Sequence, residues 1–539
     1  MSLNHETLGR MRGKESRDGR TIQYRGLKYA DIPERWQDPI MIWPQLTSLG
    51  SEFDATKHGL SSPQHPGGFP FDVSLVGNLT LAQESTEQSE FECLNLSVTL
   101  PIGAKPGDNL PVFVWIHGGA LFYGDSSWPQ YDLSNFVRTS VEIGQPVIGI
   151  SINYRLGFFG FLASDELGIS GNMGLKDTAC GFKWVKRHIA GFGGDPERVT
   201  AVGESAGSII ISTLLVANEK DLFEQAIMMS GDTALRRARK MEWQNSQYEA
   251  NIKFLGLENA SPQERKKAFY ELKAEHLIKR LPLSQHWCPT VDGKYITEEV
   301  LEGMLKAPWN IGKPDWCKRV MVGDTAHDGT VLANRIMSNP SIMSRLYNSL
   351  EDTLTATESK RLLDAYSLSG SLAPKQQYTG LLALASDLRF YLPTLQVEKG
   401  RKGMENGECF RYHFHQENPI EGPWKGYASH ELDVAYLLGN IPEAFSQEHQ
   451  RFGKEMAAAW IKFTYGGGWG SEDGKVMVIG PKEKITFEGT EEYDEKYRKG
   501  RGRLLEEIGW EKCFKFAEML QGVYGERMPP VPSLVPPKL

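Results

Sequence analysis

The stretch that decides the fold is residues 203–207, Gly-Glu-Ser-Ala-Gly, which has the pattern Gly-x-Ser-x-Gly. Residues 198–202 in front of it are largely apolar and β-branched, as in a buried parallel strand. Residues 208–216 behind it form a mostly apolar run that is typical of a buried helix. A sharp turn between such a strand and such a helix lifts the serine hydroxyl above the edge of the sheet. We therefore interpret Ser205 as a nucleophile.

A second motif is typical of the loop that stabilises the oxyanion formed when a serine attacks a carbonyl group. Residues 111–116 are expected to form a buried strand, and they run directly into His-Gly-Gly-Ala at residues 117–120. A His-Gly-Gly loop after an apolar strand carries N–H groups that stabilise an oxyanion. Glycine in this loop lets the backbone come close to the developing negative charge. The two motifs together indicate acyl-transfer chemistry at one edge of a sheet.

The general base is expected among the twelve histidines of the chain. The order nucleophile, acid, histidine that accompanies this kind of turn leaves only the histidines late in the sequence. His413 and His415 alternate within an expected strand, and His449 lies in a polar run that leads into a helix. His430 falls in a loop of small residues, 426–431, from which a base can reach across the sheet edge. We predict that His430 is the base.

The acid that orients the histidine is expected after a strand at residues 318–322. The following segment, Gly-Asp-Thr-Ala-His-Asp-Gly at 323–329, offers two carboxylates, Asp324 and Asp328. Either carboxylate could hold the imidazole in its productive tautomer and stabilise the imidazolium ion. Spacing alone does not decide between them.

The chain resembles the type-B carboxylesterases, the family that also contains the cholinesterases and the neuroligins. The resemblance implies an α/β-hydrolase fold, with a large, mostly parallel sheet flanked by helices and with insertions that form an active-site gorge. It implies one catalytic domain over residues 1–539, ending in a Pro-rich tail at about 528–539. The motifs that carry it lie in order along nearly the whole chain, at residues 7–9, 25–30, 92–96, 153–157, 171–177, 192–196, 203–207, 289–293, 323–329, 386–388 and 430–433.

The resemblance also implies roles for individual residues. Asp328 matches the catalytic acid of the family and His430 matches its catalytic histidine. The oxyanion donors would be the N–H groups of Gly119, Ala120 and Ala206. Many members of the family use glutamate as the acid. Because the aspartate side chain is one methylene shorter, the backbone of Asp328 must lie closer to His430 than the backbone of a glutamate would.

Three further residues are expected beside the nucleophile. Glu204 matches an acid that in relatives is buried behind the catalytic triad and tunes its electrostatics. Leu121 and Phe122 are expected to contribute to the substrate pocket. Ala120 and Leu121 stand where many relatives have glycine and phenylalanine, which should alter the acyl side of that pocket.

The expected function is hydrolysis of a small to medium uncharged ester through an acyl-enzyme on Ser205. An acyltransferase or a lactone-forming enzyme could use the same triad, and a non-catalytic, neuroligin-like binding protein would keep the fold without the chemistry. Cholinesterases hold the quaternary ammonium on a tryptophan shortly before the signature cysteine. Residues 77–92 contain no tryptophan, so no preference for choline esters is expected.

Composition gives no sign of a large charged partner. The net charge of −8 is small for 539 residues and gives no reason to expect nucleic acid or a membrane surface as a partner. No third ligand accompanies His413 and His415 at a metal-type spacing, so we expect neither a metal nor another cofactor. The small-molecule ester is the expected partner, and the sequence does not indicate an oligomeric state.

The number and spacing of the cysteines indicate the redox state of the compartment in which the protein works. The chain has six, scattered without a paired spacing, which fits a reducing environment. By the resemblance, the first disulfide of the family would join Cys93 to an upstream position that is Ser62 here. Residues 1–20 lack the apolar core of a signal peptide, and no apolar stretch reaches membrane-spanning length. The sequence therefore predicts a cytoplasmic protein; the ending at 537–539 is only a weak match to a peroxisomal signal.

Overall fold

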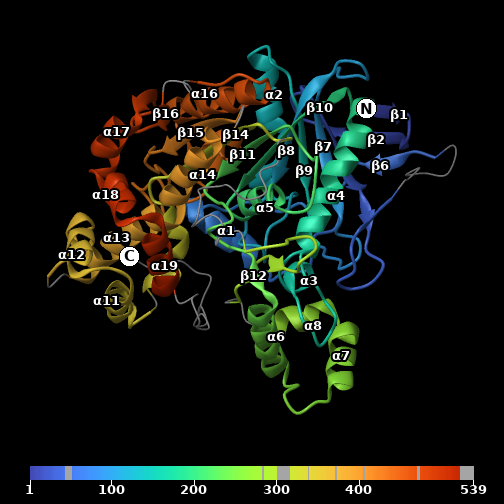
Figure 1. Ribbon diagram of the computed structural model, residues 1–539. Coiled ribbons are helices and arrows are strands. Elements are labelled where there is room, and N and C mark those ends of the chain that lie inside the picture. Colours follow the sequence, from blue (N-terminus) through green and yellow to red (C-terminus); the bar gives the residue numbers. More distant parts are fainter. Residues whose placement is uncertain are drawn as a thin grey trace.

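The computed structural model describes residues 1–42, 51–281, 285–299, 316–337, 339–370, 373–404, 407–469 and 474–521. The predicted Pro-rich tail and the chain ending lie outside these ranges. Within them, a 13-stranded sheet runs through the centre of the molecule (Figure 1). Its strands, from one edge to the other, are β1 (Ser2–His5), β2 (Gly9–Glu15), β3 (Thr21–Lys28), β7 (Asn95–Pro101), β9 (Ile148–Ile152), β8 (Leu110–Ile116), β10 (Gly194–Glu204), β11 (Gln225–Met229), β14 (Arg319–Thr325), β15 (Glu408–Phe414), β16 (Lys475–Ile479) and β17 (Ile485–Gly489), while β6 (Phe53–Ala55) pairs with β2 outside this path.

The middle of the sheet is parallel and both of its ends are antiparallel. All pairs from β9 to β16 are parallel, whereas β7 pairs antiparallel with β9, and β17 pairs antiparallel with β16. The carboxyl ends of parallel strands meet at one edge of the sheet, where ligands bind in open α/β folds. The segments that follow β8, β10, β11 and β14 therefore gather at the same edge.

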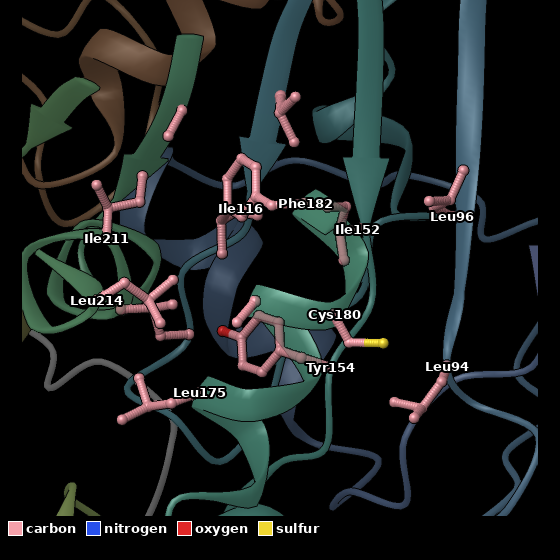
Figure 2. Packing of buried hydrophobic residues seen from close by; sticks show 14 of the residues in the cluster. Leu94, Leu96, Ile116, Ile152, Tyr154, Leu175, Cys180, Phe182, Ile211 and Leu214 are labelled. Atoms are coloured by element: carbon pink, nitrogen blue, oxygen red, sulfur yellow. The ribbon is translucent and has the colours of Figure 1, made fainter. Parts of the chain in front are cut away.

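Helices cover both faces of the sheet, because successive side chains of each central strand point to opposite sides. Val114 and Ile116 of β8 belong to a core cluster with α4 (Met173–His188) and α5 (Ala206–Leu214). Figure 2 shows Ile116 in this cluster together with Ile211 and Leu214 of α5. Trp115, between the first two, packs on the other face with α2 (Ser134–Glu142) and α16 (Gln447–Thr464).

The other described helices fill the periphery, and α6 to α8 extend away from the sheet as a separate lobe (Figure 1). A third core cluster joins α11, α13, α14, α18 and α19 to β16. The bounds are α1 (Gly68–Val76), α3 (Gly157–Phe161), α6 (Met241–Leu255), α7 (Pro262–Glu271), α8 (Ala274–Arg280), α10 (Ala333–Met337), α11 (Ile342–Thr353), α12 (Ala356–Ala365), α13 (Pro374–Ser386), α14 (Leu392–Lys402), α15 (Leu432–Leu438), α17 (Thr490–Tyr493), α18 (Arg501–Ile508) and α19 (Trp510–Gln521). Two short two-stranded sheets pair β4 (Ala30–Asp31) with β5 (Ile40–Met41) and β12 (Arg239–Lys240) with β13 (Thr290–Val291).

The predicted α/β architecture, a large and mostly parallel sheet flanked by helices, is confirmed. None of the helices in the described ranges has the length and apolar character that crossing a membrane requires. All six cysteines are buried and free. The Ser62 side chain lies close enough to the Cys93 thiol to affect its pKa.

Candidate active site

Ser205 lies on a strained turn between the end of β10 and the start of α5. Its φ of 50° and ψ of −114° form a conformation that L-residues rarely adopt, and such strain persists only where the surroundings enforce it. A Cβ atom added at Gly203 would overlap the backbone of Gly207, and one added at Gly207 would overlap the carbonyl oxygen of Ile116 on β8. Both glycines of the motif are therefore required by close backbone approach, and they hold the serine in this turn.

His430 lies in the loop before α15, and its side chain is held by Asp328. The His430 Nδ1 atom is 2.6 Å from Asp328 Oδ1. The other carboxylate oxygen, Oδ2, accepts hydrogen bonds from the Thr325 backbone N–H at 2.8 Å and from Ser230 Oγ at 3.0 Å. This arrangement fixes the tautomer with a proton on Nδ1. Within the described chain, His430 Nε2 has no hydrogen-bond partner.

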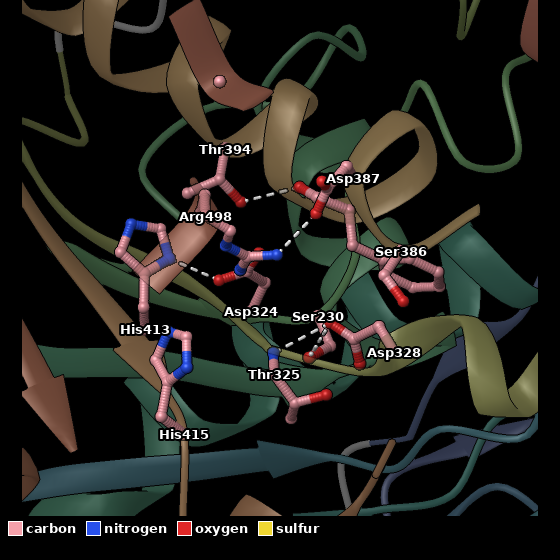
Figure 3. A network of polar contacts seen from close by, with 12 residues as sticks. Ser230, Asp324, Thr325, Asp328, Ser386, Asp387, Thr394, His413, His415 and Arg498 are labelled. Carbon is pink, nitrogen blue, oxygen red and sulfur yellow. Dashed lines mark hydrogen bonds and ion pairs between the residues drawn. The ribbon is translucent and has the colours of Figure 1, made fainter. Parts of the chain in front are cut away.

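Asp324, the other carboxylate that the sequence offered, belongs to a different network (Figure 3). Its side chain is hydrogen-bonded to His413 Nδ1, and its Oδ2 atom accepts from Arg498 Nη2 at 2.8 Å. Burial raises the pKa of Asp324, but Arg498 and His413 outweigh that effect and hold the pKa below its usual value. The geometry thus places Asp328 beside His430 and Asp324 in a buried ion network.

The loop after β8 turns sharply where the oxyanion donors were predicted. Gly119 has a φ of 98° and Ala120 a φ of 53°. In the described structure, no backbone hydrogen bond uses the N–H group of either residue. Ala206 is the first residue of α5, where N–H groups have no partner within the helix. All three N–H groups are thus available to a ligand at the serine.

Comparison with known proteins decides the family. The model of the Carboxylesterase family matches residues 2–491. The chain belongs to this family. It is 28% identical to Lipase 3 of Yarrowia lipolytica over 84% of the chain and 86% of that protein. It is also 28% identical to para-nitrobenzyl esterase of Bacillus subtilis over 82% of the chain and 86% of that protein. A solved structure of PNB esterase superposes with a TM-score of 0.72 at 26% identity, covering 93% of the chain and 99% of the esterase.

These findings confirm the predicted family and the α/β-hydrolase fold, and they identify the protein as a carboxylic ester hydrolase. In this carboxylesterase, Ser205 lines a cavity that is open to solvent; about 830 Å³ of space lies within it, part of which is bulk solvent at its mouth. Phe122 lines the cavity, as predicted for the substrate pocket. Leu121 is not among the described lining residues, because its side chain is fully buried in the core cluster beneath the loop.

Behind the nucleophile, the carboxylesterase carries a buried cluster of acids. Glu204 is fully buried, and its Oε1 atom lies 3.0 Å from His430 Nε2 without the alignment of a hydrogen bond. Burial and the nearby carboxylates, Glu431 first among them, raise the pKa of Glu204 well above its usual value. Tyr131 Oη lies 3.0 Å from both Glu431 Oε1 and Asp72 Oδ2, and burial raises the pKa of Asp72 to about 6.

Sequence reasoning found Glu204 and missed Glu431 and Asp72 of this cluster. Glu431 directly follows His430 in the chain, so an acid next to the expected base was a usable signal. Sequence reasoning also missed the polar residues of the cavity wall, Arg236, His286 and Arg335. Arg236 lies in the segment after β11, at the carboxyl edge of the parallel sheet, where such residues could have been sought.

No metal-binding arrangement accompanies the site. Across the described ranges, no group of three or more His, Cys, Asp or Glu side chains could hold a metal ion. His413 is bound to Asp324, and His415 lies 2.9 Å from the Tyr493 hydroxyl. His413 of β15 and His415, which directly follows this strand, are thus both engaged with protein groups.

Proposed function

We propose that this carboxylesterase cleaves its ester through an acyl-enzyme on Ser205, with His430 as the general base and Asp328 as its orienting acid. The observation that carries the proposal is the hydrogen bond of 2.6 Å from His430 Nδ1 to Asp328 Oδ1, while no residue that the structure describes is hydrogen-bonded to Nε2. A neutral imidazole with its proton on Nδ1 can accept a proton only at Nε2.

In the proposed reaction, Ser205 Oγ attacks the ester carbonyl carbon while His430 Nε2 takes the hydroxyl proton. The imidazolium ion then protonates the leaving alcohol, and the acyl group remains on Ser205. Water, deprotonated by the same imidazole, attacks the acyl-enzyme and releases the acid. Asp328 stays ionised throughout and stabilises the imidazolium ion.

The oxyanion of each tetrahedral intermediate is assigned to the N–H groups of Gly119, Ala120 and Ala206. Their support is the positive φ values in the loop after β8 and the position of Ala206 at the start of α5. Donors that are fixed before the reaction stabilise charge without the cost of reorganisation, and one such donor contributes about 10²–10³-fold to turnover.

Covalent labelling tests the nucleophile. A serine-directed organophosphonate should modify Ser205 alone, as mapped by peptide mass spectrometry, and the Ser205→Ala variant should take up no label. Hydrolysis of p-nitrophenyl acetate by folded Ser205→Ala should fall by about four to six orders of magnitude. Labelling of another serine, together with an active Ser205→Ala variant, would disprove the assignment.

The size of the ester follows from the cavity. An open cavity with largely apolar walls beside Ser205 supports a small to medium ester with an apolar body. The kcat/KM values for p-nitrophenyl esters of increasing acyl length should rise and then fall within this size range. A continuous rise to long chains would instead indicate a lipase-like substrate.

We also propose that the protein works in a reducing compartment, the cytoplasm. The support is that all six cysteines are free and buried, with Ser62 beside Cys93. Thiol titration under denaturing conditions should find six free thiols in protein from its native compartment. A count of four or fewer would contradict the proposal.

A further inference from the structure

The cavity that contains Ser205 has one strongly polar side. Most of its wall is apolar or aromatic, but Arg236, His286 and Arg335 also line it. A buried guanidinium group loses its hydration, and the loss is tolerated only when other groups compensate it. Arg236 is only 8% exposed, so its guanidinium group needs such compensation.

The protein itself satisfies only part of Arg236. Its Nη1 atom donates a hydrogen bond to the carbonyl oxygen of Trp287 at 2.8 Å. Within the described part of the chain, no acceptor takes a hydrogen bond from its Nε or Nη2 atom, and neither atom is sealed from solvent. Nε–H and Nη2–H point in parallel from one edge of the guanidinium group, which is the edge that binds a carboxylate with two hydrogen bonds.

No carboxylate of the described chain balances this charge. Burial lowers the pKa of Arg236 to about 10, so the group is still charged at neutral pH. The groups that partly offset burial are Cys288 and Tyr123, neither of which is ionised at that pH. Arg335, on the same cavity wall, adds a second positive group.

His286 is a second polar group on this wall that the protein leaves incomplete. Neither of its ring nitrogens has a hydrogen-bond partner in the described structure, and the side chain is 8% exposed. Burial and the surrounding arginines, Arg236 first among them, lower the pKa of His286 well below its usual value, so the ring is neutral. Both ring nitrogens are shielded from solvent, so His286 gives the cavity a neutral wall beside Arg236 rather than an exposed donor.

We propose that the ester cleaved at Ser205 carries a carboxylate, bound by the Nε–Nη2 edge of Arg236. The proposal rests on the proposed function of Ser205, and it replaces the expectation that the substrate is uncharged. The rest of the substrate is apolar, because Phe71, Phe122 and Phe390 form much of the remaining wall. The same positive wall disfavours choline esters, in agreement with the absence of a tryptophan before Cys93.

Pairs of esters that differ only in charge test the proposal. One pair places the carboxylate on the acyl side: p-nitrophenyl hydrogen adipate and the p-nitrophenyl ester of adipamic acid. The other places it on the alcohol side: 3-(4-acetoxyphenyl)propanoate and its primary amide. The amide has nearly the shape of the carboxylate but lacks the charge, so the ratio of kcat/KM within a pair isolates recognition of the anion.

For at least one pair we expect the wild-type enzyme to favour the carboxylate by about tenfold or more, as for a charge-assisted hydrogen bond at a buried site. In Arg236→Met this ratio should fall to about one or below, and Arg236→Lys should keep part of it. The matched control is Arg237→Met, which removes the same charge from a side chain that is paired with Glu518 and Glu299 and does not line the cavity. This control should keep the wild-type ratio.

The outcomes separate this inference from the proposed function. Wild-type enzyme that hydrolyses both members of each pair equally, with loss of both activities in Ser205→Ala, would overturn the carboxylate site and leave the catalytic assignment intact. A ratio that survives in Arg236→Met would also overturn it. Hydrolysis that persists in Ser205→Ala would overturn the proposed function instead. Because the wild-type ratio alone can overturn the carboxylate site, the inference remains testable if Arg236→Met does not fold.

Discussion

Asp324 and Asp328 leave the end of the same strand, β14, yet their surroundings assign them different tasks. Asp328 contacts the imidazole of His430 and is itself held by Thr325 and Ser230. Asp324 is hydrogen-bonded to His413 and forms an ion pair with Arg498, which in turn pairs with Asp387. The first carboxylate faces the group that changes protonation in the proposed mechanism. The second completes a buried network whose loss would leave charges unpaired.

Substitution by asparagine should separate these tasks. Asp328→Asn should lower kcat for p-nitrophenyl acetate about a hundredfold or more, because the amide no longer favours the tautomer with a proton on Nδ1. Its melting temperature should change little by comparison. Asp324→Asn should mainly destabilise the fold, by about 3–5 kcal/mol, since it leaves Arg498 without one of its partners. Equal losses of turnover in two folded variants would show that the assignment of the acid is wrong.

The effect of Asp433 on the pH dependence of the free energy of unfolding tests whether the buried carboxylates near His430 have raised pKa values. Burial raises the pKa of Asp433 to about 7, and the negative charge of Asp328 is the second cause of this shift. The Tyr412 hydroxyl donates a hydrogen bond to the Asp433 side chain at 3.0 Å. Because this pKa lies above that of an unfolded aspartate, about 3.9, the folded state binds the extra proton between the two values. The free energy of unfolding therefore loses the contribution of Asp433 as pH rises from about 4 to about 7.

Asp433→Asn removes this dependence. The free energy of unfolding of the variant, relative to wild type, should increase between pH 5 and pH 8, as measured by urea denaturation at both values. The comparison between variant and wild type cancels the opposite contribution of buried histidines such as His286, which gain stability as pH rises. A constant difference across this range would mean that Asp433 ionises normally in the folded protein.

At the scale of elements, the junction of β8, β10 and α5 determines where Ser205, the proposed nucleophile, lies. Gly207, at the start of α5, packs against the carbonyl oxygen of Ile116 at the end of β8. Ser205 adopts a positive φ in the turn between β10 and α5. The strand and the helix approach each other more closely than any side chain at position 207 would permit. The turn is thus fixed from both sides by backbone.

Gly207→Ala should therefore be strongly destabilising, because neither β8 nor α5 can move away without disturbing the core. We expect a loss of more than about 3 kcal/mol or no soluble protein at all. The control is Gly489→Ala at the end of β17, where an added Cβ would meet no atom within 4 Å. That variant should stay within about 0.5 kcal/mol of wild type. A Gly207→Ala variant of normal stability would contradict the close packing of this junction.

Elements with a clear local pattern were predictable from the sequence. The strand expected at 198–202 is part of Gly194–Glu204, that at 111–116 is Leu110–Ile116, and the helix expected at 208–216 is Ala206–Leu214. Buried parallel strands are continuous apolar runs, which remain visible without tertiary information. The polar wall of the cavity was not predictable, because Arg236 and His286 come from separate irregular segments. Only the folded chain brings them together.

For the molecule as a whole, the free cysteines and the position of Ser62 offer a direct experiment. Ser62 also accepts a hydrogen bond from the Leu156 backbone N–H at 3.1 Å, so its position is well defined beside the buried Cys93. The chain between Ser62 and Cys93 includes the segment that leads from α1 into β7. A covalent link at this point would close that segment into a loop.

Ser62→Cys should form a disulfide with Cys93 in protein oxidised during refolding. A closed loop of about 30 residues should stabilise the folded state by roughly 3–4 kcal/mol, if the new bond introduces no strain. The measurement is the urea midpoint of the oxidised variant compared with the same protein under reductant. The Ser62→Ala variant serves as the control and should show no dependence on reductant. Free thiols at both positions after oxidation would indicate that the two side chains do not face each other.

The buried acids behind Ser205 also affect the heat of unfolding. Burial and neighbouring carboxylates raise the pKa values of Glu204 and Glu431 well above the ordinary range, so these acids hold protons at pH values at which an unfolded chain has released them. Thermal unfolding at such a pH must then release these protons to the buffer, which absorbs them with its own heat of ionisation. The calorimetric enthalpy should therefore differ between phosphate and Tris buffers by an amount that counts the protons released. The acid cluster thus binds protons in the folded enzyme and releases them when the chain unfolds.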